Sequence, residues 1–358
     1  MKRAVLAAAV VAVVAAPLAA PARAAAEDPY SNRQWGLSQI GARDAWGVTR
    51  GRGAVVAIVD TGVDLGHPDL AANVLSYPDA DMLEGGCPES SRAKGCVRDG
   101  AQDEDGHGTY VAGIVAAQSG NGIGIEGTAP QATVLPVRVT DPATGSGSAE
   151  QVARGIRYAA DKGADVINLS LSYDPQGHLR ARQGQLAVLH TALEHAWQKG
   201  AVVVVAAGND SFPLCAEPTT AHALCVGATD RNGQRSWYSN SDTRATKTFV
   251  VAPGGDSFGG LAGITSAASA LCAGDVFSTY LRSAETDCSP EQGYEALGGT
   301  SMATPFVSGV AALLSAQGLS NAEIVACIAS TSDDLGAPGR DPIFGWGRVD
   351  AARAVTSC

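Results

Sequence analysis

Three short segments of the chain place a residue that can carry chemistry among small neighbours. Asp60 lies in Val-Asp-Thr-Gly-Val-Asp, His107 in Asp-Gly-His-Gly-Thr-Tyr-Val-Ala-Gly, and Ser301 in Gly-Gly-Thr-Ser-Met-Ala-Thr-Pro-Phe. An imidazole can take the proton of a serine hydroxyl, and a carboxylate can fix the tautomer of that imidazole and stabilise its cation. The three residue types therefore predict attack by Ser301 on a carbonyl carbon, provided that the fold brings them together.

Each segment alone also has a simpler explanation. Ser301 could merely cap a core helix, Asp60 could cap a turn, and His107 could be a satisfied core histidine. Gly298 and Gly299 would let the backbone turn tightly and let a substrate approach closely. Ser301 would then open a helix, whose unpaired N–H groups and dipole favour developing negative charge. Proline at 305 suits a first helical turn, where no N–H is needed.

Strand and helix patterns alternate along the chain and would position these segments. Continuous apolar runs predict buried parallel strands, and apolar residues three and four apart predict helices. The predicted strands are 54–59, 132–139, 165–169, 201–206 and 249–251. One predicted helix begins at His107, and three others cover 149–161, 186–198 and 301–314.

This alternation predicts an α/β fold with a doubly wound, mostly parallel sheet and helices on both faces, in three layers α/β/α. In such sheets the ligand site lies beyond the carboxyl ends of the strands. Asp60 and Asn209 each follow the end of a predicted strand. We therefore expect both side chains at the site.

The order Asp60, His107, Ser301 is the order in which the subtilisin fold supplies this constellation. The segments Val-Asp-Thr-Gly-Val-Asp, His-Gly-Thr-x-Val-Ala-Gly and Gly-Thr-Ser-Met-Ala-Thr-Pro resemble the three signature motifs of the subtilisin-like serine proteases, the subtilases. The resemblance runs from about residue 34 to the C-terminus and is to the secreted, thermitase-like bacterial branch. It implies a serine endopeptidase in which Asp60, His107 and Ser301 form the catalytic triad.

The same resemblance implies the remaining parts of an active site. Asn209, at the end of Ala-Ala-Gly-Asn, would stabilise the oxyanion together with the Ser301 backbone N–H. Two edge segments would bind an extended peptide substrate between them as an added β-strand. Their residues are Gly145, Ser146 and Gly147 in one segment and Ser170, Leu171 and Ser172 in the other. The family often has glycines where this chain has Ser172 and the following tyrosine, which would narrow the first specificity pocket.

A structural calcium ion (Ca2+) is the cofactor that the resemblance implies. Its ligands would be the side chains of Asp28, Asp69 and Asn121 and the carbonyl groups of Ile123 and Ile125. Carboxylate, amide and carbonyl oxygens are the ligands that calcium takes. The ion would tie the N-terminal arm to a Gly-rich loop and would take no part in the chemistry. Neutral turn residues are the alternative.

The first 24 residues have the pattern of a secretory signal peptide, with Lys2 and Arg3, an apolar run and Ala-Arg-Ala before the predicted cleavage site. We expect residues 25–358 to form a single peptidase domain that begins with an arm over residues 25–42. The formal net charge of −11 argues against a nucleic-acid or anionic-membrane surface. We expect an extracellular, monomeric protein whose partners are protein or peptide substrates, with no nucleic acid and no membrane.

Eight cysteines in an exported chain favour disulfides over metal thiolates. Eight cysteines allow 105 pairings, and proximity in the sequence favours four local ones. These are Cys87–Cys96, Cys215–Cys225, Cys272–Cys288 and Cys327–Cys358.

Three other functions compete with this reading. A secreted pseudoprotease would bind peptides without turnover, as would a chain held inactive for lack of a propeptide. An acid-active relative with a carboxylate base also uses Gly-Thr-Ser, but the His107 segment argues against it. An esterase would need a Gly-x-Ser-x-Gly elbow, and no segment resembles one.

Overall fold

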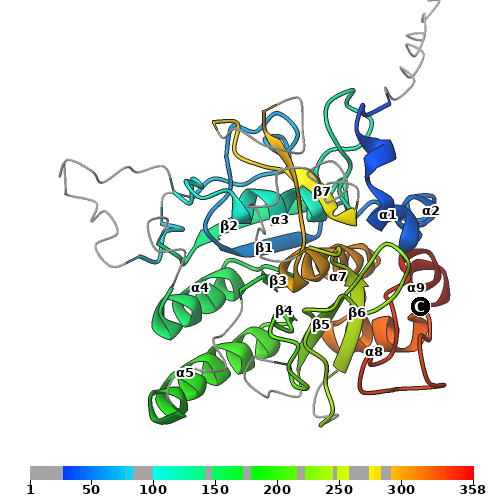
Figure 1. Cartoon of the computed structure of the whole chain (residues 1–358). Helices are drawn as coiled ribbons and strands as arrows, with labels where there is room; N and C mark the ends of the chain where they lie inside the picture. The colour runs from blue at the N-terminus through cyan, green and yellow to red at the C-terminus, as the bar shows by residue number, and fades with distance from the viewer. Residues whose placement is uncertain are drawn as a thin grey trace, which may run out of the picture.

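A computed structural model describes most of the chain (Figure 1). The residues that it describes are 27–77, 79–83, 100–141, 147–171, 179–215, 222–244, 248–257, 274–283 and 292–358.

The centre of the fold is a six-stranded sheet in which every neighbouring pair is parallel. Its strands, in the spatial order β2-β1-β3-β4-β5-β6, are β2 (Thr133–Arg138), β1 (Val55–Asp60), β3 (Val166–Leu169), β4 (Val202–Ala206), β5 (Ala223–Thr229) and β6 (Thr248–Pro253). A separate antiparallel hairpin pairs β7 (Val276–Thr279) with β8 (Tyr294–Leu297).

Helices cover both faces of the sheet (Figure 1). The helices are α1 (Trp35–Gln39), α2 (Ala42–Ala45), α3 (His107–Ala116), α4 (Ala149–Asp161), α5 (Leu179–Gln198), α7 (Thr300–Ser315), α8 (Asn321–Thr331) and α9 (Ala351–Ser357), with a short 3-10 turn at Ser31–Arg33. Helices α3, α7, α8 and α9 share one apolar core with the sheet, and α4 and α5 share the other.

The two cores follow from the period of two along each strand. On β1, Val56 and Ile58 pack into the α3–α7 core, while Ala57 and Val59 pack into the α4–α5 core. Both sets are fully buried, which explains why the strand is a continuous apolar run. The predicted α/β fold with helices on both faces is confirmed.

The predicted elements all occur, and their ends move by one to a few residues, except that α5 begins seven residues earlier. The sequence pattern missed β5, the β7–β8 hairpin and helices α1, α2, α8 and α9. Residues 223–229 are mostly small, with Leu224 and Val226 as the larger aliphatic side chains, and all seven are buried between β4 and β6. This segment is a strand because it pairs with β4 on one side and β6 on the other, which lie outside the segment in the sequence.

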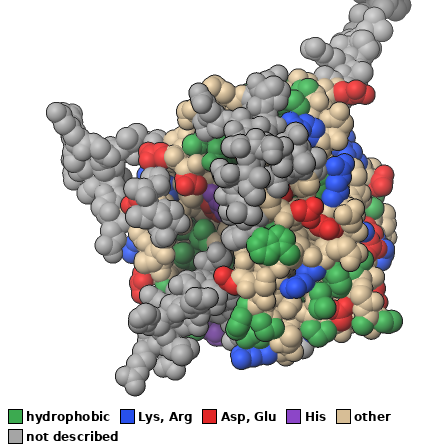
Figure 2. Space-filling model, in the orientation of Figure 1, with side chains coloured by type: hydrophobic (Ala, Val, Ile, Leu, Met, Phe, Trp, Pro, Cys, Tyr) green, Lys and Arg blue, Asp and Glu red, His purple; other side chains and the backbone are tan. Residues whose placement is uncertain are grey.

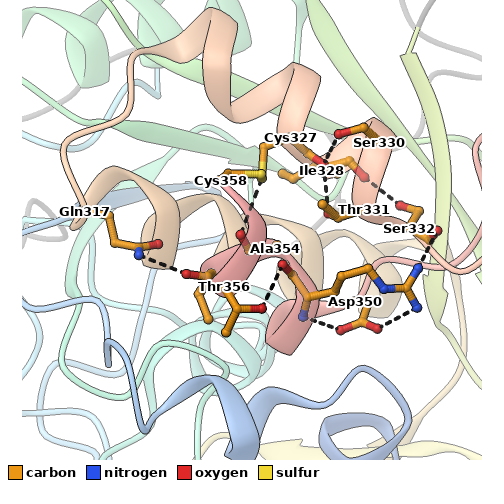
Figure 3. The surroundings of a disulfide bond; sticks show 12 residues. Gln317, Cys327, Ile328, Ser330, Thr331, Ser332, Asp350, Ala354, Thr356 and Cys358 are labelled. Carbon is orange, nitrogen blue, oxygen red and sulfur yellow. Dashed lines mark hydrogen bonds and ion pairs between the residues drawn. A yellow bond between two sulfur atoms is a disulfide. The ribbon is translucent and has the colours of Figure 1, made fainter.

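Two of the four predicted disulfides lie in the described residues and are confirmed. Cys215–Cys225 joins the segment after β4 to β5, and Cys327–Cys358 joins α8 to the C-terminal residue. Figure 3 shows Cys358, at the end of α9, against Cys327 on α8. The predicted pairs Cys87–Cys96 and Cys272–Cys288 lie outside the described residues.

Acidic, basic and hydrophobic side chains are interspersed over the face in view (Figure 2). Of the helices in the described ranges, none is both long enough and apolar enough to cross a membrane.

Candidate active site

Asp60 and His107 form a hydrogen-bonded pair where β1 ends and α3 begins. The ring nitrogen Nδ1 of His107 lies 2.7 Å from Oδ1 of Asp60. The same carboxylate oxygen accepts the backbone N–H of Thr61 at 2.8 Å. Asp60 is fully buried, whereas the His107 side chain is 27% exposed. One ring nitrogen is therefore held by the protein, and the other, Nε2, is left to act as a base.

A second carboxylate, which the sequence reasoning did not single out, fixes the start of α3. Asp103 is buried, and its Oδ1 accepts the N–H groups of Asp105 and Gly106 at 3.0 Å. Its Oδ2 accepts both the N–H and the hydroxyl of Thr109. Because these bonds cover the unpaired N–H groups of the first turn, they determine where the helix begins and where His107 projects. The Asp-Glu-Asp-Gly pattern before His107 was the available signal.

Two opposing effects act on the pKa of His107. Burial alone lowers it, because burial disfavours the charged imidazolium. The Asp60 carboxylate outweighs burial and, with Asp105 and Asp103 nearby, raises the pKa to about 9. The site is thus built to stabilise a positive charge on this imidazole.

Ser301 is the second residue of α7, which packs directly against α3. The glycine pair before it serves the protein's own backbone. Gly299 has a φ of 151°, and a Cβ on Gly298 would lie 1.7 Å from the carbonyl oxygen of Ser257. The expectation that both glycines make room for a substrate was wrong at Gly298, where another segment of the chain fills that space.

Pro305 lies in the second turn of α7, not in the first as the sequence suggested. Proline has no N–H, so it cannot pair with the carbonyl oxygen four residues earlier, which is that of Ser301. The Ser170 hydroxyl donates to that oxygen instead, at 2.8 Å. In return, the Ser301 hydroxyl donates to the Ser170 carbonyl at 2.9 Å. Within the described contacts, Ser301 makes no hydrogen bond with His107, so its hydroxyl has to turn before it can transfer a proton there.

The side-chain amide of Asn209 is oriented by the residue just before Ser301. Its oxygen Oδ1 accepts both the N–H and the hydroxyl of Thr300, each at 2.9 Å. The Thr300 hydroxyl in turn accepts the N–H of Gly208 at 3.2 Å. With its oxygen fixed, Asn209 presents its NH₂ group as a donor next to the N-terminus of α7. Thr300 is a second residue that the sequence reasoning missed.

The predicted substrate-binding residues are only partly covered by the structure. Ser170 is buried against Ser301, and Leu171 follows it, half-buried. Gly147 lies against the end of β2, where a Cβ would come within 2.3 Å of the Val139 carbonyl oxygen. Gly145, Ser146 and Ser172 lie outside the described residues.

The predicted calcium ligands meet around residues 119–125. The Asp28 carboxylate accepts the N–H groups of Gly120, Asn121 and Gly122. Asp69 accepts from the side-chain amide of Asn121 at 2.9 Å and from the N–H of Ile125 at 2.8 Å. The remaining predicted ligand residue, Ile123, is 39% exposed, and its N–H donates to the side-chain oxygen of Asn121.

The charge of this loop tests whether a cation fits there. Asp28 and Asp69 are 3% and 0% exposed, and none of the ion pairs in the described ranges includes either carboxylate. Burial, together with the nearby Asp28, raises the pKa of Asp69 to about 7. Two buried oxygen ligands that lack a cationic partner fit calcium. Among the described residues, no three acidic, histidine or cysteine side chains are arranged so that they could hold a metal ion together, so backbone and amide oxygens would have to complete the coordination.

Comparisons with known proteins place the chain in one family. Residues 51–347 match the family model described as "Subtilase family". Thermitase of Thermoactinomyces vulgaris is 40% identical over 92% of this chain and 98% of its own length. Subtilisin Savinase of Lederbergia lenta is 34% identical over 90% of this chain and 98% of its own length. A solved protease from Pseudoalteromonas arctica PAMC 21717 has a TM-score of 0.71 and 30% identity, over 93% of this chain and 99% of that one.

Proposed function

The chain belongs to the subtilase family and is a subtilisin-like serine protease, and on that basis we propose that it is an endopeptidase whose catalytic residues are Asp60, His107 and Ser301. The observation that carries this assignment is the 2.7 Å contact between His107 and Asp60 at the start of a helix that packs against the helix of Ser301. A pseudoprotease would have no need to hold this imidazole against a buried carboxylate.

The reaction follows from the groups in place. The Ser301 hydroxyl turns from the Ser170 carbonyl, gives its proton to Nε2 of His107, and attacks the scissile carbonyl carbon. Asp60 stabilises the imidazolium that results. His107 then donates the proton to the leaving amine as the C–N bond breaks, which leaves an acyl-enzyme. A water molecule attacks the acyl group with His107 again as base, and Ser301 regains its proton.

Asn209 and the Ser301 backbone N–H stabilise the oxyanion in both steps. The amide oxygen of Asn209 is already bound by Thr300, so the NH₂ group needs no reorientation when charge develops. Loss of one such donor costs about 10²–10³ in kcat, a figure measured on subtilisin itself.

The substrate binds as an extended strand between Gly145–Gly147 and Ser170–Ser172. Backbone hydrogen bonds would supply affinity there and side-chain pockets selectivity. The support comes from Ser170, which lies against Ser301 and begins the second edge segment. Protein and peptide chains are therefore the expected substrates.

A structural calcium ion is bound by Asp28, Asp69, Asn121, Ile123 and Ile125. Its role is to neutralise two buried carboxylates and so tie the N-terminal arm to the loop at 119–125. It supplies no step of the chemistry. Because Asp28 precedes the family match and Asp69 follows β1, the ion would join segments that are far apart in the sequence.

The protein is exported, with residues 1–24 removed as a signal peptide, and works outside the cell as a monomer with a single catalytic domain at 25–358. The two disulfides in the described residues support an oxidising location.

The test is a Ser301→Ala variant. It should lose casein hydrolysis and labelling by a fluorophosphonate while keeping the unfolding temperature of the wild type. Undiminished hydrolysis by this variant, or labelling at another residue, would overturn the assignment. A wild-type chain that is folded but neither labelled nor active would identify a pseudoprotease.

A further inference from the structure

Asn240 is a fully buried residue that none of the assignments above uses. It lies in the connection between β5 and β6, far in the sequence from the segment that carries Asn209. The structure pairs these two segments. Ser211 N–H donates to the Tyr238 carbonyl at 2.8 Å, and Ser241 N–H donates to the Phe212 carbonyl at 3.0 Å.

Four hydrogen bonds join Asn240 to residues on both sides of Asn209. Before it, the Asn240 side-chain NH₂ donates to the Ala207 carbonyl, and the Asn240 backbone N–H donates to the Gly208 carbonyl, both at 2.9 Å. After it, the Asn240 side-chain oxygen accepts the N–H groups of Asp210 at 3.0 Å and of Phe212 at 2.7 Å. Asn240 thus bridges the turn that carries Asn209 and does not contact its side chain in the described contacts.

The backbone of this turn needs such support. Gly208 has a φ of 104°, and Ser211 has a φ of 55°, the only positive φ at a non-glycine among the described residues. Glycine adopts a positive φ without strain, whereas the left-handed conformation of Ser211 costs free energy and persists where the surroundings hold it in place. An amide side chain supplies this support well, because its oxygen accepts two bonds while its nitrogen donates a third.

Two independent supports therefore meet at Asn209. Thr300 orients its side chain, as described above, and the Asn240 bonds hold the backbone from which that side chain projects. We propose that Asn240 is a positioning residue of the oxyanion site, which holds the turn at 207–212 so that the Asn209 NH₂ group meets the developing charge. This inference rests on the proposed function of Asn209 as an oxyanion donor.

A double-mutant cycle tests it, with kcat and KM measured on a chromogenic peptide and active enzyme counted by fluorophosphonate titration. Misplacement of a catalytic group by about 1 Å can cost about 10² in rate, so Asn240→Ala should lower kcat about 10–100-fold. KM should stay within about twofold, since ground-state contacts are unchanged. In an Asn209→Ala background, the same change should cost less than about threefold, because the group that it positions is absent.

Two further variants separate positioning from general destabilisation. Thr331→Ala removes a buried hydroxyl on α8, which donates to the Cys327 carbonyl at 2.8 Å and has no hydrogen bond with Asn240 in the described contacts. It should lower the unfolding temperature and leave kcat unchanged. Asn240→Asp keeps the oxygen that accepts from Asp210 and Phe212 and should retain more activity than Asn240→Ala. If Asn240→Ala does not fold, Asn240→Asp takes its place in the double-mutant cycle.

The outcomes distinguish this inference from the proposed function. If the wild-type chain is neither labelled at Ser301 nor active, the proposed function fails. If the wild type is active but the Asn240 change costs the same factor with and without Asn209, the positioning role is wrong. The role is equally wrong if the titrated Asn240→Ala enzyme keeps the wild-type kcat.

Discussion

Replacing Asp60 with asparagine isolates the charge of the carboxylate from its geometry. Oδ1 of Asp60 accepts two N–H groups, one from Thr61 and one from His107. An asparagine oxygen can accept both bonds, so the imidazole keeps its orientation, but an amide no longer enforces the tautomer as a carboxylate does. What the variant loses is the negative charge, together with some stability, because its NH₂ group would occupy the buried position of Oδ2, which has no partner in the described residues.

The size of the effect follows from the pKa of His107. Asp60 and its acidic neighbours raise this pKa from 6.5 to about 9 despite burial. A shift of that size corresponds to about 3 kcal/mol of stabilisation of the imidazolium. The imidazolium forms as Ser301 loses its proton, so Asp60→Asn should lower kcat by at least about 10²-fold at a pH where both enzymes have neutral His107.

The pKa shift of His107 also predicts the direction in which the pH profile of activity should move. Histidine must be neutral to act as base, so wild-type kcat/KM should rise with pH through a pKa well above 6.5. In Asp60→Asn, burial acts without the carboxylate, and the midpoint should move below that of the wild type. The folded protein gains stability from the raised pKa at pH below 6.5 and loses this contribution as the pH rises through about 9.

The assay is a pH profile of peptide hydrolysis, with NMR titration of the His107 ring in a Ser301→Ala background as a direct control. A wild-type midpoint at or below 6.5 would refute the electrostatic reasoning. So would an Asp60→Asn midpoint that does not move, or a loss in kcat of less than about threefold.

Three further predictions follow from particular contacts. Ser170→Ala leaves the buried Ser301 carbonyl without its donor and should lower the free energy of unfolding by about 1–3 kcal/mol, measured by denaturant titration; an unchanged midpoint would contradict the role given to this hydroxyl. Cys358→Ser opens the loop of 31 residues closed by Cys327 and should cost about 3–4 kcal/mol by the same measurement, against reduced wild type as control. A chelator should lower the unfolding temperature of the wild type and have little effect on Asp28→Asn, whereas equal shifts in both would count against the calcium assignment.

The sequence alone determined the parts of this protein that depend on local pattern. The apolar run before Asp60 predicted a buried parallel strand, and β1 is one, with all but its first residue buried. The apolar spacing after His107 predicted a helix that begins at this residue, and α3 does begin there. The three motifs in their order predicted the subtilase family, which the comparisons show.

Other features could be predicted from the sequence only in part. Residues 223–229 carry too few large apolar side chains to read as a strand, and their neighbours β4 and β6 decide it. Pro305 was expected in the first turn of a helix that begins at Ser301, but it lies in the second turn of α7, where the Ser170 hydroxyl donates to the carbonyl that proline leaves without a partner. Each difference arises from a partner more than ten residues away.

The residues that could carry chemistry were therefore readable from types and spacing, because a nucleophile, a base and an orienting carboxylate are chemically distinctive. The residues that hold these side chains in place could not be predicted from the sequence. Thr300 and Asn240 are ordinary polar residues until the fold brings donors and acceptors to them from distant segments. Hydrogen bonds at 3 Å depend on exact partners across the sheet, and no local pattern encodes those partners. The sequence predicted the groups that are proposed to react, and only the tertiary structure decided what holds them in place.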